Sequence, residues 1–249
     1  GISLELGGKS PLIVCEDGGD MDAIVDWVLT GILWGSGQVC SATSRVLVHE
    51  SLMEELVKRV VEKALSVPIG DTQSENAMGD SPFMGPVINK VQYDKIWNYI
   101  DEAKTAGYSV FGGERDTVAS LGNGYFVPPT IFVDPPIDSR VWKEEIFGPV
   151  LCMRSFSSEA EAVKEANNTT YGLAAAVFST NTETLKRITS NLRAGIVWTN
   201  NCQPAFIQAP WGGVKQSGFG RELGRWGLEE FTAVKQVCGC ENGFKWDLW

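Results

Sequence analysis

Three apolar segments of this chain, each with strand character, are followed directly by a signal that opens a helix. After residues 46–48, 150–156 and 174–178 comes a Ser or Thr with a Glu three residues later, the spacing of a helix capping box. Strands that alternate with helices are typical of parallel sheets, whose strands are joined by crossovers. We therefore expect an α/β fold with three layers, in which helices cover both faces of a largely parallel, twisted sheet. The predicted capping residues are Ser51, Ser158 and Thr180.

Two further helices and a late strand follow from the same kind of pattern. Asp20 and Asn89 each precede apolar residues at helical spacing, so each is expected to cap a helix. Residues 194–200 are apolar in the middle, which predicts a strand in the centre of the sheet. Residues 201–220 are rich in Gly, Pro and Gln, which is typical of a long functional loop.

The composition of the chain excludes several classes of function. The net charge is −10 and no run of Lys and Arg could follow a phosphate backbone, so we expect no nucleic-acid partner. No apolar run approaches the roughly 18 residues of a membrane-spanning helix, so we expect no membrane partner. The six cysteines lack the spacing of a disulfide framework, which is typical of reduced intracellular proteins. Cys238-Gly-Cys240 has neither a second pair nor a nearby histidine, so we expect no metal site.

Cys40 is the residue that first suggests catalysis. Gly35 and Gly37 would let the backbone turn sharply just before it, but a nucleophilic cysteine also needs a base or a lowered pKa. From these residues alone, a small buried cysteine is the simpler interpretation. The single histidine, His49, follows nine residues later at the far end of a predicted strand, so a Cys40–His49 hydrolase is a poor but open alternative.

Two motifs that carry carboxylates offer other partners for this thiol. Glu5 stands before a Gly-Gly pair, where a glycine hinge would let it act as a general base; a solvated glutamate at a strand end is the alternative. The segment 143–150, KEEIFGPV, places two glutamates beside an aromatic residue, and such a carboxylate can accept hydrogen bonds from sugar hydroxyls. Each motif is weak evidence by itself.

Taken together and in order, these motifs resemble the aldehyde dehydrogenase superfamily. The matching stretches are LELGGKSP at 4–11, GQVCSATSR at 37–45, EEIFGPV at 144–150 and APWGGVKQSGFGRELG at 209–224. The resemblance runs from Leu4 to about Val237, and it is strongest to the plant-type betaine aldehyde and aminoaldehyde branch. It implies the fold of the family's catalytic domain, which agrees with the three-layer α/β prediction.

The resemblance implies a chemical role for each motif. Cys40 corresponds to the nucleophile that attacks the aldehyde carbonyl, with its own backbone N–H as half of the oxyanion hole, and Glu5 to the base that activates water to hydrolyse the thioester. The thiohemiacetal passes a hydride to the cofactor, which is NAD, with NADP also possible because the residue that distinguishes them lies outside this chain. The implied cofactor-binding residues are Glu145, Phe147, Leu6, Gln92 and Lys95.

The resemblance also implies the kind of aldehyde. Trp34 and Trp211 correspond to aromatic residues of the substrate pocket, and an aromatic face within about 6 Å of a cation attracts it by about 0.5–2 kcal/mol. Betaine aldehyde or an ω-aminoaldehyde is therefore the expected substrate, with a general aliphatic aldehyde dehydrogenase and a non-catalytic structural protein as alternatives. Phe206 contributes either to the pocket or to core packing, and the bulk of Ile196 favours aminoaldehydes over the wider betaine aldehyde.

The resemblance divides the chain into two parts. Residues 1–232 correspond to the catalytic domain, with 1–8 as the end of an otherwise missing NAD-binding domain, and 233–249 correspond to a C-terminal oligomerisation tail. Because family members have about as much sequence again before the ELGG motif, we expect the chain alone to bind NAD weakly. The full-length protein is expected to form a homodimer or homotetramer and to be intracellular, either in the cytoplasm or in an organelle such as a plastid or peroxisome.

Overall fold

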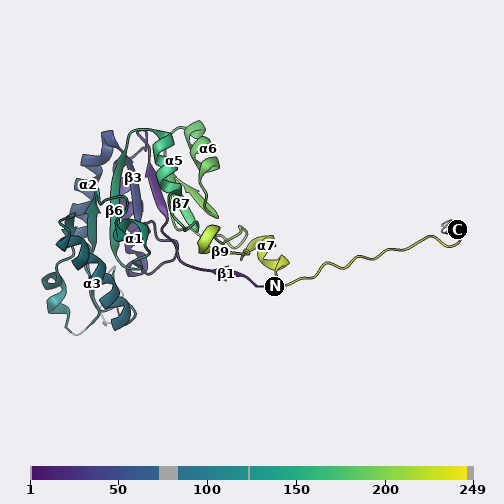
Figure 1. Cartoon of the computed structure of the whole chain (residues 1–249), viewed down its shortest axis with the longest axis horizontal. Helices are drawn as coiled ribbons and strands as arrows, with labels where there is room; N and C mark the ends of the chain where they lie inside the picture. The colour runs from purple at the N-terminus through teal and green to yellow at the C-terminus, as the bar shows by residue number, and fades with distance from the viewer. Residues whose placement is uncertain (1, 73–83, 123, 246–249) are drawn as a thin grey trace.

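A seven-stranded sheet forms the centre of the computed structural model, which describes residues 2–72, 84–122 and 124–245 (Figure 1). The strand order is β4-β5-β6-β3-β2-β7-β8, and every neighbouring pair is parallel except β4 and β5. The sequence prediction of a largely parallel sheet is therefore confirmed. The strands are β2 (Pro11–Val14), β3 (Arg45–His49), β4 (Ser109–Gly112), β5 (Thr130–Val133), β6 (Val150–Phe156), β7 (Ala174–Phe178) and β8 (Ile196–Thr199).

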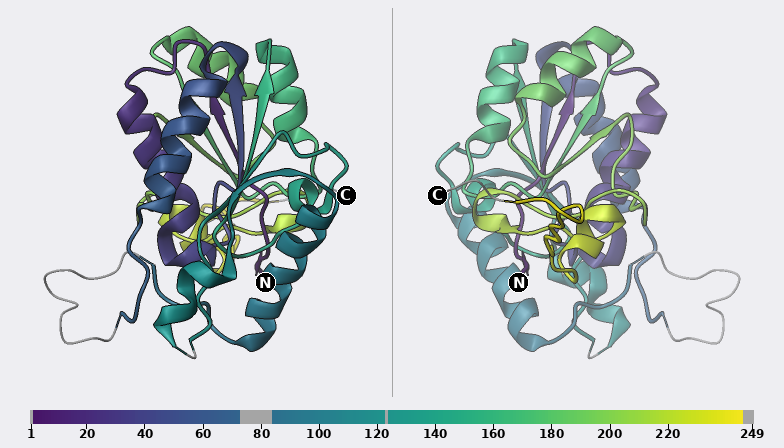
Figure 2. Two further views of the ribbon diagram at one scale, coloured as in Figure 1. Left: turned by 90° about the vertical axis from the view of Figure 1, so that its left-hand side faces the viewer. Right: turned by 90° about the vertical axis from the view of Figure 1, so that its right-hand side faces the viewer.

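Helices cover both faces of the sheet, which confirms the three-layer architecture (Figure 2). In β2, Leu12 and Val14 pack on one face and Ile13 on the other, so both faces are buried and the strand is apolar throughout. One face is covered by α1 (Met21–Leu33) and α2 (Glu50–Leu65). The other is covered by α3 (Lys90–Thr105), α4 (Arg140–Lys143), α5 (Glu159–Asn167) and α6 (Thr182–Asn191).

Three of the five predicted helix caps are confirmed. The side chains of Asp20, Asn89 and Ser158 each accept a hydrogen bond from a backbone N–H in the first turn of α1, α3 and α5, respectively. These donors have no partner within the helix, so a short polar side chain at the N-cap stabilises each helix start.

The two other cap predictions, at Ser51 and Thr180, are wrong. Strand β3 runs without a linker into α2, so His49 occupies the cap position and its Nδ1 accepts the N–H of Ser51. In α6 the cap is Asn181, whose side-chain oxygen accepts two first-turn N–H groups at 2.9 and 3.2 Å. Asn caps a helix better than Thr, and the better residue one position later decides where the helix begins.

The prediction that residues 194–200 form a central strand is also wrong in its placement. Strand β8 lies at the edge of the sheet and pairs only with β7 among the described strands. Its apolar character comes from cover by the following loop. The indole N–H of Trp198 donates to the carbonyl of Pro204 at 3.1 Å, and its ring lies 6.3 Å from that of Trp211. A loop that covers an edge strand protects it as a neighbouring strand would.

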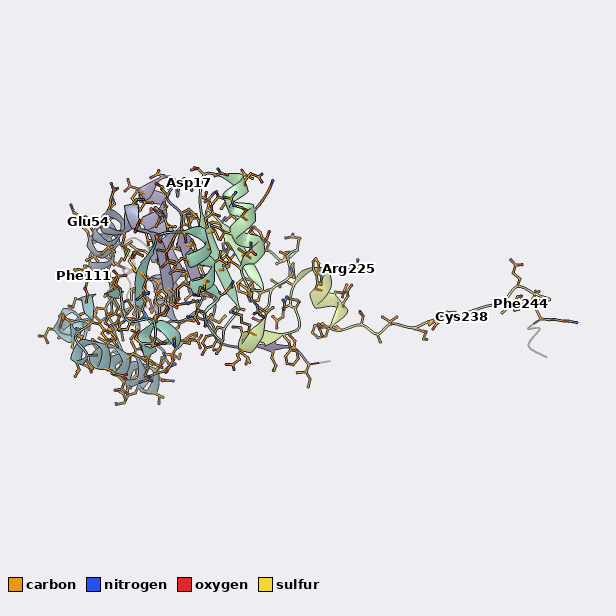
Figure 3. The ribbon with its side chains drawn as sticks, turned by 45° about the horizontal axis from the view of Figure 1, so that its top comes forward. Asp17, Glu54, Phe111, Arg225, Cys238 and Phe244 are labelled. Carbon is orange, nitrogen blue, oxygen red and sulfur yellow. The ribbon has the colours of Figure 1, made fainter. Side chains whose placement is uncertain are left out.

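A two-stranded ribbon and a short helix lie apart from the main sheet. Strand β1 (Leu4–Glu5) pairs antiparallel with β9 (Gly218–Phe219) in a small ribbon, and α7 (Gly224–Glu229) follows it. Beyond α7 the chain extends away from the body, with Cys238 and Phe244 far out on this extension (Figures 1 and 3). Phe231, Val234 and Val237 expose more than four fifths of their surface there.

Within the described residues, no helix has both the length and the apolar character that crossing a membrane requires.

A fully buried arginine joins the sheet to α5. The Arg45 side chain is 1% exposed and donates to the backbone carbonyls of Lys9, Glu165 and Ala166 at 3.0, 3.2 and 2.8 Å. Its guanidinium also lies 5.3 Å from the centre of the Trp142 ring. Burial lowers the pKa of Arg45 to about 10. The planar fork of the guanidinium satisfies three carbonyls at once, which a lysine could not do.

We expect Arg45→Lys to lower the free energy of unfolding by about 2–4 kcal/mol, because at least one buried carbonyl loses its partner and the cation loses its stacking surface. Urea denaturation measures this change. Arg59→Lys is the matched control, since Arg59 forms exposed ion pairs with Asp22 and Glu55, and its midpoint should stay close to that of the unsubstituted chain. Equal midpoints for the two variants would contradict the prediction.

Candidate active site

The candidate site lies at the amino ends of three adjacent parallel strands. Strands β6, β3 and β2 are neighbours in the sheet, and the loop before each carries one motif from the sequence analysis. Glu5 precedes β2, Cys40 precedes β3, and Glu145 precedes β6. Because the amino ends of parallel strands share one edge of the sheet, the three loops meet there.

The Cys40 loop turns as the glycines predicted. Gly35, Ser36 and Gly37 have φ values of 61°, 57° and 75°, so three successive residues adopt the left-handed conformation. A side chain at Gly37 would collide with the backbone of Gly148, which precedes β6. Ser36 is held by a hydrogen bond from its hydroxyl to the carbonyl of Gly85 at 2.9 Å. The turn leaves Cys40 half-buried at the edge of the sheet.

The Gly7-Gly8 pair, predicted as a hinge for Glu5, lies where the three loops pack closely. A side chain at Gly8 would collide with the carbonyl of Cys40, and the N–H of Gly8 donates to Oε1 of Glu145 at 2.9 Å. Gly8 is therefore a point where all three motifs are in contact. The glycine is required by this close packing, and its φ lies outside the left-handed region.

One side chain, that of Gln92, fixes the segment that follows Glu145. The amide Nε2 of Gln92, on α3, donates to the carbonyls of Ile146 and Phe147 at 2.9 and 2.6 Å. Phe147 has a φ of 62°, which is a strained conformation for an aromatic residue and needs such support. Lys95 lies about one turn further along α3 and is partly exposed.

Burial is the main influence on the pKa of Glu5. It raises the pKa of the carboxyl, and the negative charge of Glu222 raises it further. The indole N–H of Trp211 and the charge of Arg221 act in the opposite direction. The backbone N–H of Leu6 donates to Ser217 at 3.0 Å, and this bond with the β1–β9 pairing holds the glutamate in place.

The pKa of the Cys40 thiol is subject to opposing influences. Burial raises its pKa, and the charges of Glu5 and, to a smaller extent, Glu145 add to the rise. The backbone N–H groups of Ser41 and of Cys40 itself lower it by hydrogen bonding to the sulfur. These two N–H groups are also the donors that could stabilise negative charge on a carbonyl oxygen attacked by the thiol.

The predicted substrate residues fall into two groups. Trp211 and Ile196 are partly buried against the core, and Trp211 lies beside Glu5. Trp34 and Phe206 are 54% and 62% exposed and project from the surface. Among the described residues, the ring contact of Trp211 is with Trp198, so the structure does not bring the predicted aromatic residues together as a closed box.

His49 lies away from the site, which contradicts the Cys40–His49 hydrolase alternative. It ends β3, whereas Cys40 precedes the same strand, and four residues of strand correspond to roughly 13 Å. Its Nδ1 is 2.8 Å from the Ser51 hydroxyl, and its ring packs edge-on against Phe156.

Three contacts of the site were not predicted from the sequence, although Ser217 and Glu222 lie in the stretch 209–224 and Gln203 in the loop 201–220. The buried hydroxyl of Ser217 donates to Gly7 at 2.7 Å and accepts from the N–H of Gly172 at 2.9 Å, which joins the Glu5 strand to the start of β7. The charge of Glu222 raises the pKa of Glu5. The side chain of Gln203 accepts a hydrogen bond from the hydroxyl of Ser41. All three belong to segments distant from the motifs they contact, so only the fold brings them together.

Lys9, whose place in the LELGGKSP motif we interpret as structural, is fully buried. Burial lowers its pKa to about 8, and the nearby Cys152 and the carboxylates of Glu144 and Glu145 act against this shift. Its Nζ has no hydrogen-bond partner among the described residues.

Comparison with known proteins identifies the family of this chain. The model of the aldehyde dehydrogenase family matches residues 1–237. The chain is 48% identical over 246 residues to chloroplastic betaine aldehyde dehydrogenase of Beta vulgaris, covering 98% of the chain and 48% of the relative. It is 48% identical over 237 residues to peroxisomal aminoaldehyde dehydrogenase 2 of Pisum sativum, covering 95% and 46%.

A solved structure gives the same result for the fold. The NAD+ complex of an aldehyde dehydrogenase from Bacillus cereus superposes with a TM-score of 0.88 at 43% identity, covering 95% of this chain and 46% of that one. The chain thus spans about half the length of the relatives it matches. With a family model over residues 1–237, and with the loops that carry Glu5, Cys40 and Glu145 packed together at Gly8, the chain belongs to the aldehyde dehydrogenase family.

Proposed function

We propose that this chain is the catalytic portion of an NAD-dependent aldehyde dehydrogenase that oxidises betaine aldehyde or an ω-aminoaldehyde to the acid. The observation that supports this most directly is the meeting of the Glu5, Cys40 and Glu145 loops at Gly8. The pKa of the Glu5 carboxyl is raised and its charge acts on the Cys40 thiol, which supports the proposed roles of base and nucleophile.

In the proposed mechanism, Cys40 is the nucleophile. Its S–H bond breaks as the proton leaves to solvent, the sulfur bonds to the aldehyde carbon, and the backbone N–H groups beside the sulfur stabilise the oxyanion that forms from the carbonyl. NAD, when bound, accepts the hydride from that carbon, which leaves a thioester on Cys40. The N–H groups then polarise the thioester carbonyl for attack by water.

Glu5 is the proposed general base for this last step. A carboxyl whose pKa is raised by burial takes up a proton more readily than an exposed one, as general-base catalysis near neutral pH requires. When Glu5 takes a proton from water, the water oxygen attacks the thioester. This releases the carboxylic acid and regenerates the thiol of Cys40.

The residues before β6 fit the ribose of a nicotinamide cofactor. One carboxylate oxygen of Glu145 accepts from Gly8, so the side chain is already oriented and its other acceptor positions can take ribose hydroxyls. Phe147 is partly exposed beside it, and Gln92 keeps this segment in position. Leu6, 46% exposed, is proposed to present its backbone to the carboxamide, and Lys95 to approach the ribose. The complex of the Bacillus cereus relative contains NAD+, which favours NAD over NADP.

The names of two relatives and the aromatic residues support the substrate class. The Beta vulgaris and Pisum sativum proteins are named as betaine aldehyde and aminoaldehyde dehydrogenases. Trp34 and Trp211 are proposed to face the cation, with Phe206 and Ile196 shaping the pocket. Because Trp34 and Phe206 project outward from the described residues, we propose that the pocket is completed by chain outside this structure or by a partner subunit. A general aliphatic aldehyde dehydrogenase is the second candidate.

The exposed apolar residues of the tail support the proposed domain division. Residues 1–232 would form the catalytic domain, with 1–8 continuing from a dinucleotide-binding domain. Residues 233–249 would dock on another subunit in a homodimer or homotetramer, which would cover Val234 and Val237. The relatives named above are chloroplastic and peroxisomal, so an organelle is the proposed compartment.

We expect Cys40→Ser to lower the hydrolysis of p-nitrophenyl acetate by the chain at least about 100-fold, because a serine without a paired base is a far weaker nucleophile. Release of nitrophenolate measures the rate. Cys238→Ser is the control, since that thiol is exposed on the extension away from the site, and its rate should match that of the unsubstituted chain. Hydrolysis that survives in Cys40→Ser would contradict the proposed nucleophile.

We expect Glu5→Gln to change ester hydrolysis and thiol alkylation in opposite directions. The substitution removes the base and slows turnover after the first acylation. It also removes a negative charge that raises the pKa of Cys40, so the thiolate forms at lower pH. The pH midpoint of iodoacetamide alkylation should fall by about half a unit, which makes the rate below the midpoint about threefold higher. A midpoint that rises would argue against this charge interaction.

We expect Trp34→Leu to reduce kcat/KM for betaine aldehyde or 3-aminopropanal about 2- to 30-fold more than kcat/KM for hexanal, because only the cationic substrates lose a cation–π contact. NADH formation is measured in a protein that joins this chain to an upstream dinucleotide-binding half. Trp34→Phe keeps an aromatic face and should restore most of the preference. Equal losses for all three aldehydes would favour the aliphatic alternative.

A further inference from the structure

The side chain of Gln203 contacts the residue next to the nucleophile on two sides. Its Oε1 accepts the hydroxyl of Ser41 at 2.6 Å, and its Nε2 donates to the backbone carbonyl of Ser41 at 3.0 Å. The same Nε2 lies 3.5 Å from the carbonyl of Gly31 on α1. Gln203 is 9% exposed and Ser41 is 1% exposed, so water cannot easily replace these bonds.

The backbone of Gln203 is strained in a way that these contacts explain. Its φ is 73°, which costs a residue with a side chain about 1–3 kcal/mol and persists only where the surroundings enforce it. The conformation turns the amide inward, toward Ser41 and Gly31. Strain of this kind is concentrated at functional sites.

The other contacts of this region make Ser41 a fixed point between two elements. The carbonyl of Gly31, which faces Gln203, also accepts the N–H of Thr43 at 3.0 Å. Gln203 therefore ties the segment just after Cys40 to the last turns of α1, from which the Cys40 loop begins. Fixing both the hydroxyl and the carbonyl of Ser41 limits rotation of its peptide groups.

The orientation of the Ser41 peptide matters because it begins at Cys40 and its N–H affects the thiol. That N–H and the N–H of Cys40 are the two groups that lower the pKa of the thiol against burial and the charge of Glu5. A small rotation would weaken both donors, since hydrogen bonds weaken steeply with angle. Simple packing of an amide would not require the pair of bonds in opposite directions that Gln203 makes with one residue.

We propose that Gln203 is a positioning residue that orients the Ser41 and Cys40 backbone N–H groups toward the thiol, and that it connects the substrate loop to the nucleophile. The connection follows from the chain itself: Pro204, the next residue, accepts from Trp198, whose ring contacts Trp211 beside Glu5. This inference rests on the proposed role of Cys40 as nucleophile. Gln203 itself acts only through Ser41.

The test measures the reactivity of Cys40 without any cofactor. In a chain that carries Cys238→Ser and Cys240→Ser, so that the exposed thiols do not react, the rate of alkylation by iodoacetamide is followed from pH 6 to 10. Peptide mass spectrometry confirms that Cys40 is the alkylated residue. Gln203→Met keeps the length of the side chain but makes no hydrogen bond, and Ser41→Ala removes only the hydroxyl bond.

We expect Gln203→Met to raise the pH midpoint of alkylation by about half to one unit and to slow the first acylation by p-nitrophenyl acetate about 5- to 30-fold. Ser41→Ala should give a smaller change in the same direction. Because both act through one contact, the two substitutions combined should give less than the sum of their separate effects.

Thermal unfolding of each variant separates positioning from folding. A Gln203→Met chain that is folded, with the pH midpoint and acylation rate of the unsubstituted chain, overturns the proposal. If Gln203→Met does not fold, Ser41→Ala decides alone, and an unshifted midpoint there overturns it equally. Failure of the proposed function would give a different result. Ester hydrolysis would then survive Cys40→Ser, whereas the pH midpoints of alkylation would still show whether Gln203 positions the Ser41 peptide.

Discussion

Backbone packing between three loops is the constraint on which the rest of the site depends. Gly37 lies against Gly148, and Gly8 lies against the carbonyl of Cys40 while its N–H holds Glu145. A side chain at Gly8 or Gly37 would separate the loops by the width of a methyl group or more. The spacing of the loops that carry Cys40, Glu5 and Glu145 is thus set by the backbone, and the parallel sheet beneath fixes the order in which the loops meet.

The same closeness creates an electrostatic conflict between Glu5 and Cys40, the proposed base and nucleophile. The charge of Glu5 raises the pKa of Cys40, and partial burial raises the pKa of both. Two groups that disfavour each other's charge are poorly suited to direct proton exchange in the resting state. They suit a sequence of separate steps, in which the thiol reacts first and the glutamate acts once the sulfur is bonded to carbon and carries no charge.

Short sequence patterns predicted those helix starts that depend on hydrogen bonds between neighbouring residues. Asp20, Asn89 and Ser158 cap helices because each bonds to a backbone N–H two or three residues away. Contacts between distant segments escaped prediction. Strand β8 was placed in the centre of the sheet because nothing local shows that the loop after it covers Trp198. The contacts of Gln203 and Ser217 were not predicted for the same reason, since their partners lie 162 and 210 residues away in the chain.

The position of Cys40 relative to α1 limits how the thiol can be activated. Cysteines with strongly lowered pKa values often lie at helix N-termini, where the dipole stabilises the thiolate. Cys40 instead follows the C-terminal end of α1, and the site lies at the amino ends of the strands, whereas ligands of open α/β sheets usually bind at the carboxyl ends. Neither the helix nor a histidine lowers its pKa, so two backbone N–H groups remain as the local stabilisation. A thiol of this kind needs an electrophilic partner, and an aldehyde carbonyl is one. The orientation of those N–H groups therefore decides how reactive Cys40 can be.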